Sequence, residues 1–389
     1  MDQIEGIISD PEVEGTGIKA ALTTLSQALA DFSQSPYQET NANIVMNAFK
    51  GVTQVLNEYD ANLKTLMEQT KNDLSVAVED INTKLDQLSE LNSSIAHEIF
   101  SNNDYDGVNY GPNDLLDQRN VILDDLSRYG DVQVTDLEDG KIQVKINGKV
   151  VVDASGASYT NDKLNIGSDG VTLTWNSNNQ NANLGAGAIR GFTDMLTGAD
   201  PINAGIPYYQ NKMDNFAQTL ADVFNKKIHA DDPDFPDKYK FLLQGGVDGK
   251  VTAGNISISD QWADDVSYII RKQNPDGELD NQDILDMKAA FEQDFNFGGE
   301  YTGTFSEFIT SVTNTLGSGI KTNSARMSAS LAIAESADSE RMGVSGVSLN
   351  EEGISMMTYN KAYQALGRLM TTMDEQLDMI INKMGIVGR

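Results

Sequence analysis

The chain has 389 residues, 39% of them hydrophobic, so it can bury a substantial core, and its length predicts two or three domains. Its 58 acidic and 28 basic residues give a net charge of −30, which argues against nucleic acid and anionic membranes as partners. Cysteine is absent, which excludes disulfides, thiolate metal sites and cysteine nucleophiles.

The charge is distributed unevenly along the chain. Residues 312–389 hold seven basic and eight acidic residues, so this methionine-rich segment is nearly neutral and suited to packing against like subunits. The acidic remainder is better suited to facing water. The two histidines are His97 and His229, and His97 lies in a long helical pattern that favours a solvated position. The sequence has no run of roughly 20 apolar residues for a membrane span and no secretory signal at its amino terminus.

Helical spacing dominates the first hundred residues. Apolar side chains from residue 16 to about residue 33 predict one amphipathic helix that ends near Pro36. A much longer helix follows, because apolar residues recur by fours and threes from Val45 to Leu66 and again from Leu74 to Leu88. We expect this long helix to lie in a bundle, since its apolar face needs covering.

The long helix contains one irregularity of spacing. Between Leu66 and Leu74 the steps through Thr70 are four and four, a stutter that locally unwinds a left-handed supercoil. No proline lies between Pro36 and Pro112, so the helix is expected to continue through the stutter. Pro112 is expected in the first turn of a further helix that extends to about Tyr129.

Short strands are predicted after this helix. Alternating runs separated by turn dipeptides occur at 132–134, 141–146, 150–152 and 171–175, and they indicate antiparallel hairpins. Helix returns from about Ile206 to His229. A second irregular region, about 231–300, contains a strand candidate at 255–259, and the chain is expected to be helical again from about Phe305.

The terminal segment has the most regular pattern. Ser348 to Glu351 form a capping box that predicts the start of a helix, and Leu349 begins its apolar stripe. The stripe continues at heptad a and d positions through Met356, Tyr359, Tyr363, Leu366, Met370, Met373, Leu377, Ile380 and Met384. We interpret these residues as a helix-pairing surface for assembly.

Motifs that could carry chemistry are weak. Asn102, Asp104 and Asp106 resemble the front of a calcium loop, but the twelfth position is Asn113 rather than the required glutamate, which favours a solvated turn. The run Gly185–Gly191 resembles a phosphate loop with one residue too many, and a flexible connection from hairpin to helix is favoured. A paired-carboxylate hydrolase is proposed by no particular segment, although 58 acidic residues allow one. We expect no catalytic, cofactor or metal site.

Two segments resemble a known family. Ser345–Ala365, with Tyr359, Ala362, Tyr363 and Ala365, resembles the carboxyl-terminal signature of flagellar rod, hook and hook-associated proteins. Gln3–Ile8 and a second motif resemble hook-associated protein 1 in particular. The residues of that second motif are Asn113, Asp114, Leu115, Leu116, Asp117, Gln118 and Arg119.

The resemblance implies an α+β, mainly α fold: an elongated helical bundle with coiled-coil-like helices and inserted antiparallel β-rich modules. The expected segments are a helical bundle at 1–130, a β-rich module at 131–204, a returning helix at 205–230, a second irregular module at 231–303, bundle again at 304–345 and the terminal helix at 346–389. The resemblance also implies that the chain begins after a further amino-terminal helix, the partner of the terminal helix.

The function implied by the resemblance is a non-catalytic subunit that joins hook to filament. Its implied partners are identical subunits in a ring, hook protein, hook-associated protein 3 and a flagellar export chaperone, with no nucleic acid and no membrane. The implied location is the extracellular flagellum, reached by export without a cleaved signal peptide. Two alternatives stay open: a filament subunit or adhesin, and a carboxylate-based hydrolase.

Overall fold

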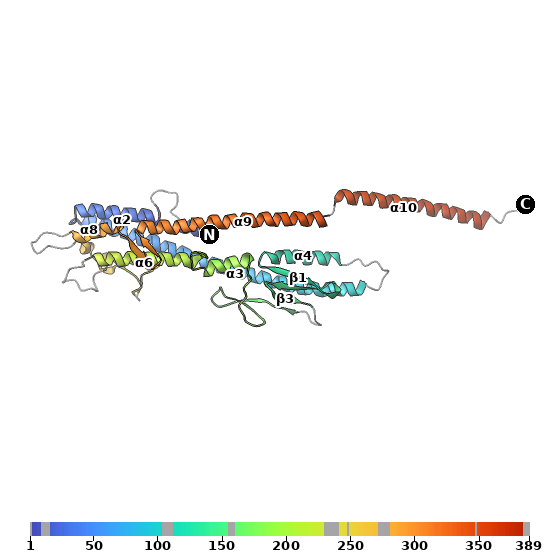
Figure 1. The fold of residues 1–389 in the computed structure, drawn as a ribbon, viewed down its shortest axis with the longest axis horizontal. Coiled ribbons are helices and arrows are strands. Elements are labelled where there is room, and N and C mark those ends of the chain that lie inside the picture. The colour runs from blue at the N-terminus through green and yellow to red at the C-terminus, as the bar shows by residue number, and fades with distance from the viewer. Residues whose placement is uncertain are drawn as a thin grey trace, which may run out of the picture. The chain divides into compact units, whose positions relative to one another are not determined.

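The computed structural model describes residues 2–8, 16–102, 112–154, 160–228, 241–246, 249–270, 281–346 and 348–383. The chain divides into two units, Met1–Ile320 and Lys321–Arg389, which are described separately. Long helices and small antiparallel sheets make up the fold (Figure 1), which confirms the mainly α, α+β class.

The described helices carry the labels of Figure 1. The α-helices are α1 (Asp2–Ile8), α2 (Gly17–Gln34), α3 (Glu39–Asn102), α4 (Asn113–Ser127), α5 (Gly187–Thr197), α6 (Ile206–Lys227), α7 (Asp260–Asp264), α8 (Gln282–Ala289), α9 (Phe305–Ser345) and α10 (Leu349–Asp378). Short 3-10 turns are η1 (Glu138–Gly140), η3 (Val266–Ile269) and η4 (Ala290–Glu292), and a π-helical turn, η5 (Met379–Lys383), follows α10. The long helix is confirmed: α3 has 64 residues, or about 95 Å at ~1.5 Å per residue. Pro112 is the cap before α4 rather than its first-turn residue.

The predicted hairpins are also confirmed. The strands are β1 (Val132–Asp136), β2 (Ile142–Ile146), β3 (Lys149–Asp153), β4 (Thr160–Asn161), β5 (Leu164–Ile166), β6 (Leu173–Trp175), β7 (Leu243–Gln244), β8 (Ser257–Ile258), β9 (Phe295–Phe297) and β10 (Tyr301–Gly303). They form one sheet in the order β1-β2-β3-β4 and three two-stranded sheets, all antiparallel. Asn147 and Gly148, both at positive φ, make the tight turn between β2 and β3.

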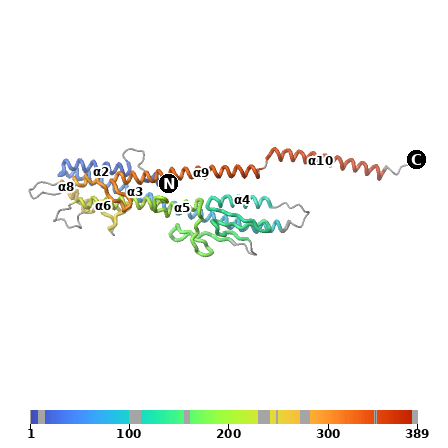
Figure 2. The backbone as a smooth tube through the Cα atoms, viewed as in Figure 1, coloured from blue at the N-terminus to red at the C-terminus, as the bar shows by residue number. Residues whose placement is uncertain are grey.

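Two separate hydrophobic cores lie along α3. Its buried apolar residues up to Leu66 belong to a first core with α1, α2, α6, α8 and the start of α9. Its buried apolar residues from Leu74 to Leu88 belong to a second core with α4, α5 and strands β2, β3, β5 and β6. Figure 2 shows that the segments of the second core follow those of the first along this helix. The division falls at the stutter through Thr70, so the irregular spacing marks a change of packing partners.

The irregular region after α6 contributes to the first core. Trp262 is fully buried and meets Phe49 of α3 edge to face, with ring centroids 5.3 Å apart. Phe297 of β9 stacks on Phe308 of α9 at 4.3 Å between centroids, and both rings lie against Phe216 of α6. Aromatic pairs in these geometries add stabilisation beyond the area they bury. The described residues of 241–303 therefore share one core with the long helices.

Asparagine amides on the helices hold the strand segments by imitating a neighbouring strand. Asn92, fully buried on α3, accepts a hydrogen bond from the Ile142 amide at 3.1 Å and donates one to its carbonyl at 2.9 Å. Asn82 binds both backbone groups of Leu164 in the same way, each at 2.9 Å. On α6, Asn225 accepts from the Leu242 and Leu243 amides and donates to the Leu243 carbonyl. Each amide satisfies backbone groups that would otherwise be buried without partners.

The second unit contains the residues of α9 from Lys321 onward, together with α10. Buried residues of α9 end at Leu316, and the described side chains from Lys321 to Val344 are exposed. The helix α10 begins as predicted, because the Ser348 hydroxyl accepts a hydrogen bond from the Glu351 amide at 3.4 Å. Among the described residues, no helix is long and apolar enough to cross a membrane.

Replacing Asn92 with leucine should weaken the second core. The change keeps the number of side-chain heavy atoms but leaves two buried backbone groups of Ile142 without partners, at about 1–3 kcal/mol each. We expect the free energy of unfolding to fall by about 2–4 kcal/mol, measured by urea unfolding and the fluorescence of Trp175 in a Trp262→Phe background. The control Asn120→Leu, at an exposed position of α4, should change it by less than about 0.5 kcal/mol. Equal effects of the two changes would contradict the role assigned to Asn92.

Candidate assembly surface

The apolar stripe predicted for the terminal helix is exposed along its described length. Its members on α10 and η5 are Met356, Tyr359, Tyr363, Leu366, Met370, Met373, Leu377 and Ile380, and their exposed fractions run from 50% at Leu377 to 78% at Tyr363. Met384 lies outside the described residues. A helix with so many exposed large apolar side chains is stabilised when a partner covers them.

The first half of this stripe borders a shallow groove. Leu349, Met356, Tyr359 and Tyr363 line it, together with small or polar neighbours such as Gly353. Glycine has no side chain, so it leaves room beside the aromatic rings for a side chain from another helix. The groove has the geometry of a hole that a knob from a partner helix can fill.

Further apolar residues of α10 and η5 flank the stripe. Leu369, Met379 and Ile381 are more than half exposed, as are Ile354 and Met357 on other faces of the helix. The heptad pattern did not select them because they lie off its a and d positions. The apolar surface of this helix is therefore wider than the sequence stripe indicated.

The second predicted motif, at the start of α4, serves the internal structure of the first unit. Asn113, Asp114, Asp117 and Gln118 are exposed, Leu115 and Leu116 are half-buried, and Arg119 is buried. Arg119 donates a hydrogen bond from Nη1 to the Gly140 carbonyl at 2.6 Å. Burial lowers the pKa of Arg119, and the nearby Asp136 opposes that shift.

The turn that Arg119 holds is packed closely against α3. Gly140 has a φ of +67°, and a Cβ placed there would lie 2.5 Å from Ile99 and 3.2 Å from Ile95. Arg119 therefore ties α4 to the η1 turn, and the η1 turn rests on α3. The motif acts as a clamp between two helices and a hairpin.

The glycine run 185–191 is part of a connection with little free space. Gly187, the first residue of α5, has a φ of +76°, and a Cβ there would lie 2.5 Å from the Tyr129 carbonyl carbon. As predicted, the run leads into a helix, and at Gly187 it lies close against the backbone of Tyr129 and Gly130. In the described part of the chain the sheets are antiparallel, so the run lacks the βαβ setting of a phosphate loop.

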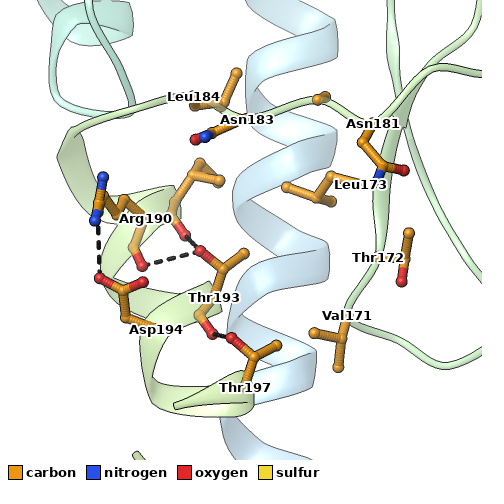
Figure 3. Close-up of a pocket in the computed structure, with 12 residues that line it drawn as sticks. Val171, Thr172, Leu173, Asn181, Asn183, Leu184, Arg190, Thr193, Asp194 and Thr197 are labelled. Carbon is orange, nitrogen blue, oxygen red and sulfur yellow. Dashed lines mark hydrogen bonds and ion pairs between the residues drawn. The ribbon is translucent and has the colours of Figure 1, made fainter. Parts of the chain in front are cut away.

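A pocket of about 360 Å³ lies between α5 and β6, lined on one side by Thr193 and Thr197 and on the other by Val171 and Leu173. Figure 3 shows Asp194, its one acidic lining residue, joined to Arg190 by an ion pair of 3.3 Å. A glycosidase needs two carboxyl groups flanking its substrate, and this pocket does not supply them. The described residues also contain no cluster of three or more metal-binding side chains.

Other sequence candidates are placed as follows. His97 is exposed on α3, in agreement with a solvated role. The calcium-loop candidates Asp104 and Asp106 lie outside the described residues, as does His229.

Comparison with known protein families shows the family to which the chain belongs. Residues 1–235 match the family described as the flagellar hook-associated protein FlgK helical domain. This chain belongs to that family. Residues 339–383, which include the exposed stripe up to Ile380, match the carboxyl-terminal family of the flagellar basal body rod proteins FlgEFG.

Two known proteins are similar to this chain. Flagellar hook-associated protein 1 of Bacillus subtilis (strain 168) is 26% identical over 430 residues, covering 100% of this chain and 80% of that protein. The solved structure of the flagellar hook junction protein FlgK from Burkholderia pseudomallei has 21% identity and a TM-score of 0.46. That match covers 58% of this chain and 40% of the solved one. As a hook-associated protein, the chain is a structural component of the bacterial flagellum.

Replacing Arg119 with alanine should loosen the clamp at the η1 turn. The change removes a charged hydrogen bond to the carbonyl of half-buried Gly140, so we expect a loss of about 1.5–3 kcal/mol in the free energy of unfolding of the second core. Urea unfolding followed by the fluorescence of Trp175, in the Trp262→Phe background, measures this free energy. Arg128→Ala, which removes an exposed guanidinium paired with Asp125 at 3.5 Å, should cost less than about 1 kcal/mol. An Arg119 effect no larger than this control would contradict the clamp.

Two glycine substitutions separate backbone strain from close packing. Gly187→Ala and Gly148→Ala place a side chain at nearly the same positive φ, +76° and +79°, so both carry about 1–2 kcal/mol of backbone strain. Only Gly187 also faces backbone atoms, whereas nothing lies within 4 Å of a Cβ at Gly148. We expect Gly187→Ala to cost about 1–3 kcal/mol more than Gly148→Ala in the same urea experiment. Equal losses would show that the connection before α5 can yield.

Proposed function

We propose that this hook-associated protein is a structural subunit that joins the flagellar hook to the filament by assembling with copies of itself into a ring. The assembly surface is the stripe on α10 and η5 from Met356 to Ile380, continued by Met384. One observation carries the proposal: the segment that matches the rod-protein family is also the segment whose large apolar side chains are exposed.

The charge of the chain supports an assembly role for this segment. The described part of α10 and η5 contains basic Lys361, Arg368 and Lys383 against five acidic residues, so like segments repel one another weakly. Nearly all of the net charge of −30 lies before residue 312, which keeps the first unit soluble while the terminal segment associates.

The proposal extends to partners and location. Hook protein and hook-associated protein 3 are the proposed axial neighbours, and a dedicated chaperone would cover the apolar stripe before export. Export would proceed without a cleaved signal peptide, to the extracellular part of the flagellum. The proposed role is non-catalytic, as suits a member of a family of hook-associated proteins.

A pair of substitutions two residues apart on α10 tests the assembly surface. Leu366→Glu places a charge on the stripe, and Gln364→Glu places the same charge on another face of the same exposed helix. Glutamate suits a helix interior, so neither change should unfold α10. We expect Leu366→Glu to weaken self-association at least tenfold in analytical ultracentrifugation, because pairing would bury a charge, while Gln364→Glu changes it less than twofold.

The same pair tests the biological role. In a motile bacterium that lacks its own hook-associated protein 1, the protein with the Gln364→Glu change should restore filaments, and the protein with Leu366→Glu should not. Electron microscopy of flagella measures the result. Filaments on cells that carry the Leu366→Glu variant, as well as on those with Gln364→Glu, would show that the stripe is not required at the junction.

A further inference from the structure

The chain passes between the two hydrophobic cores of the first unit twice. Buried members of the second core all lie between Leu74 and Leu196, and buried members of the first core lie before and after that range. The first crossing is the segment 67–73 of α3, and the second is the loop 198–205 between α5 and α6. Two cores joined by two covalent links can change their mutual angle without breaking either core.

The first crossing is thinly packed. Of residues 67–73, Thr70 alone is buried, and Met67 is half-buried with contacts to both cores. The Thr70 hydroxyl donates to the Leu66 carbonyl at 2.8 Å, one turn back, a bond that favours bending of a helix. This segment is also the stutter, where the supercoil changes its winding.

The second crossing is held mainly by its own short-range bonds. The Gly205 amide donates to the Gly198 carbonyl at 3.1 Å, and Ala199 pairs with Ala204. The Asp200 carboxylate accepts from the Ile202 amide at 2.8 Å and the Asn203 amide at 2.9 Å. A loop stabilised from within can act as a pivot, since its bonds survive small rotations of the helices at its ends.

We infer that α3, which both cores share, contains a hinge. The two cores bend relative to each other about residues 67–73 and the loop 198–205, and they unfold separately. Partly buried side chains at the two crossings join the cores: Met67 touches both, and Met195 of α5 and Ala204 of the loop pack on the first core. Methionine side chains are flexible and repack at low cost, so they permit the motion. In the proposed junction, this hinge would let one subunit contact both the subunit lattice of the hook and that of the filament.

The chain provides a fluorescent reporter in each core. Trp175 is buried in the second core and Trp262 in the first, and these are its two tryptophans. Variants with Trp262→Phe or Trp175→Phe each leave one reporter. Ile81→Ala should lower the urea midpoint seen by Trp175 by about 1 M or more and leave the Trp262 midpoint within about 0.2 M. Leu56→Ala should do the reverse.

Either of two outcomes overturns the inference. In the first, the Trp175 and Trp262 transitions move together in both variants, which would show a single cooperative unit. In the second, Ile81→Ala abolishes the second core and the Trp262 transition is lost with it, whereas a retained Trp262 transition supports separate unfolding.

Amide hydrogen exchange tests the hinge itself. Residues 67–73 should exchange at least about tenfold faster than the α3 residues on either side, although they lie in the middle of a 64-residue helix. Equal protection from residue 52 to residue 88 would rule out a hinge in α3.

Discussion

Burial of the apolar face of α3 is the constraint on which the first unit depends. A helix of 64 residues cannot hold itself in water by backbone hydrogen bonds alone, so its long stripe must be covered by other segments. Helices α1, α2, α6 and α8 cover the part up to Leu66, and α4, α5 and the hairpins cover the part from Leu74. Three strand segments, at Ile142, Leu164 and Leu242–Leu243, are also attached to helices through the amides of Asn92, Asn82 and Asn225.

The second unit has the opposite energetic balance. Its described helices expose methionine, leucine, isoleucine and tyrosine side chains that the first unit would bury, and they gain stability only from a partner. The same physical effect therefore folds one part of the chain and, in the proposed function, drives the association of the other. The difference between a first unit with buried cores and a second unit with exposed apolar side chains fits a hook-associated protein, because such proteins are structural subunits of an assembly.

Helices and hairpins were predictable because their signals are local. The four-three spacing of α3 and α10, the turn at Asn147-Gly148 and the capping serine at Ser348 each depend on neighbours within a few residues. The exposed stripe was predictable as an amphipathic pattern, although the flanking Leu369, Met379 and Ile381 were not. The tight packing at Gly187 was missed, because a glycine-rich run indicates flexibility unless a distant backbone segment is known to lie against it.

The sequence by itself determined where the long helices and the strands β1, β2, β3, β6 and β8 lie, where α3 changes its spacing, and that the terminal segment is neutral and amphipathic. Those properties follow from side-chain periodicity and composition. The tertiary structure alone decided that the stutter at Thr70 separates two cores, that Arg119 clamps a turn across 21 residues, and that Asn92 binds a strand 50 residues away. Such contacts join residues far apart in the chain, and no local pattern states which distant backbone group a buried side chain will meet.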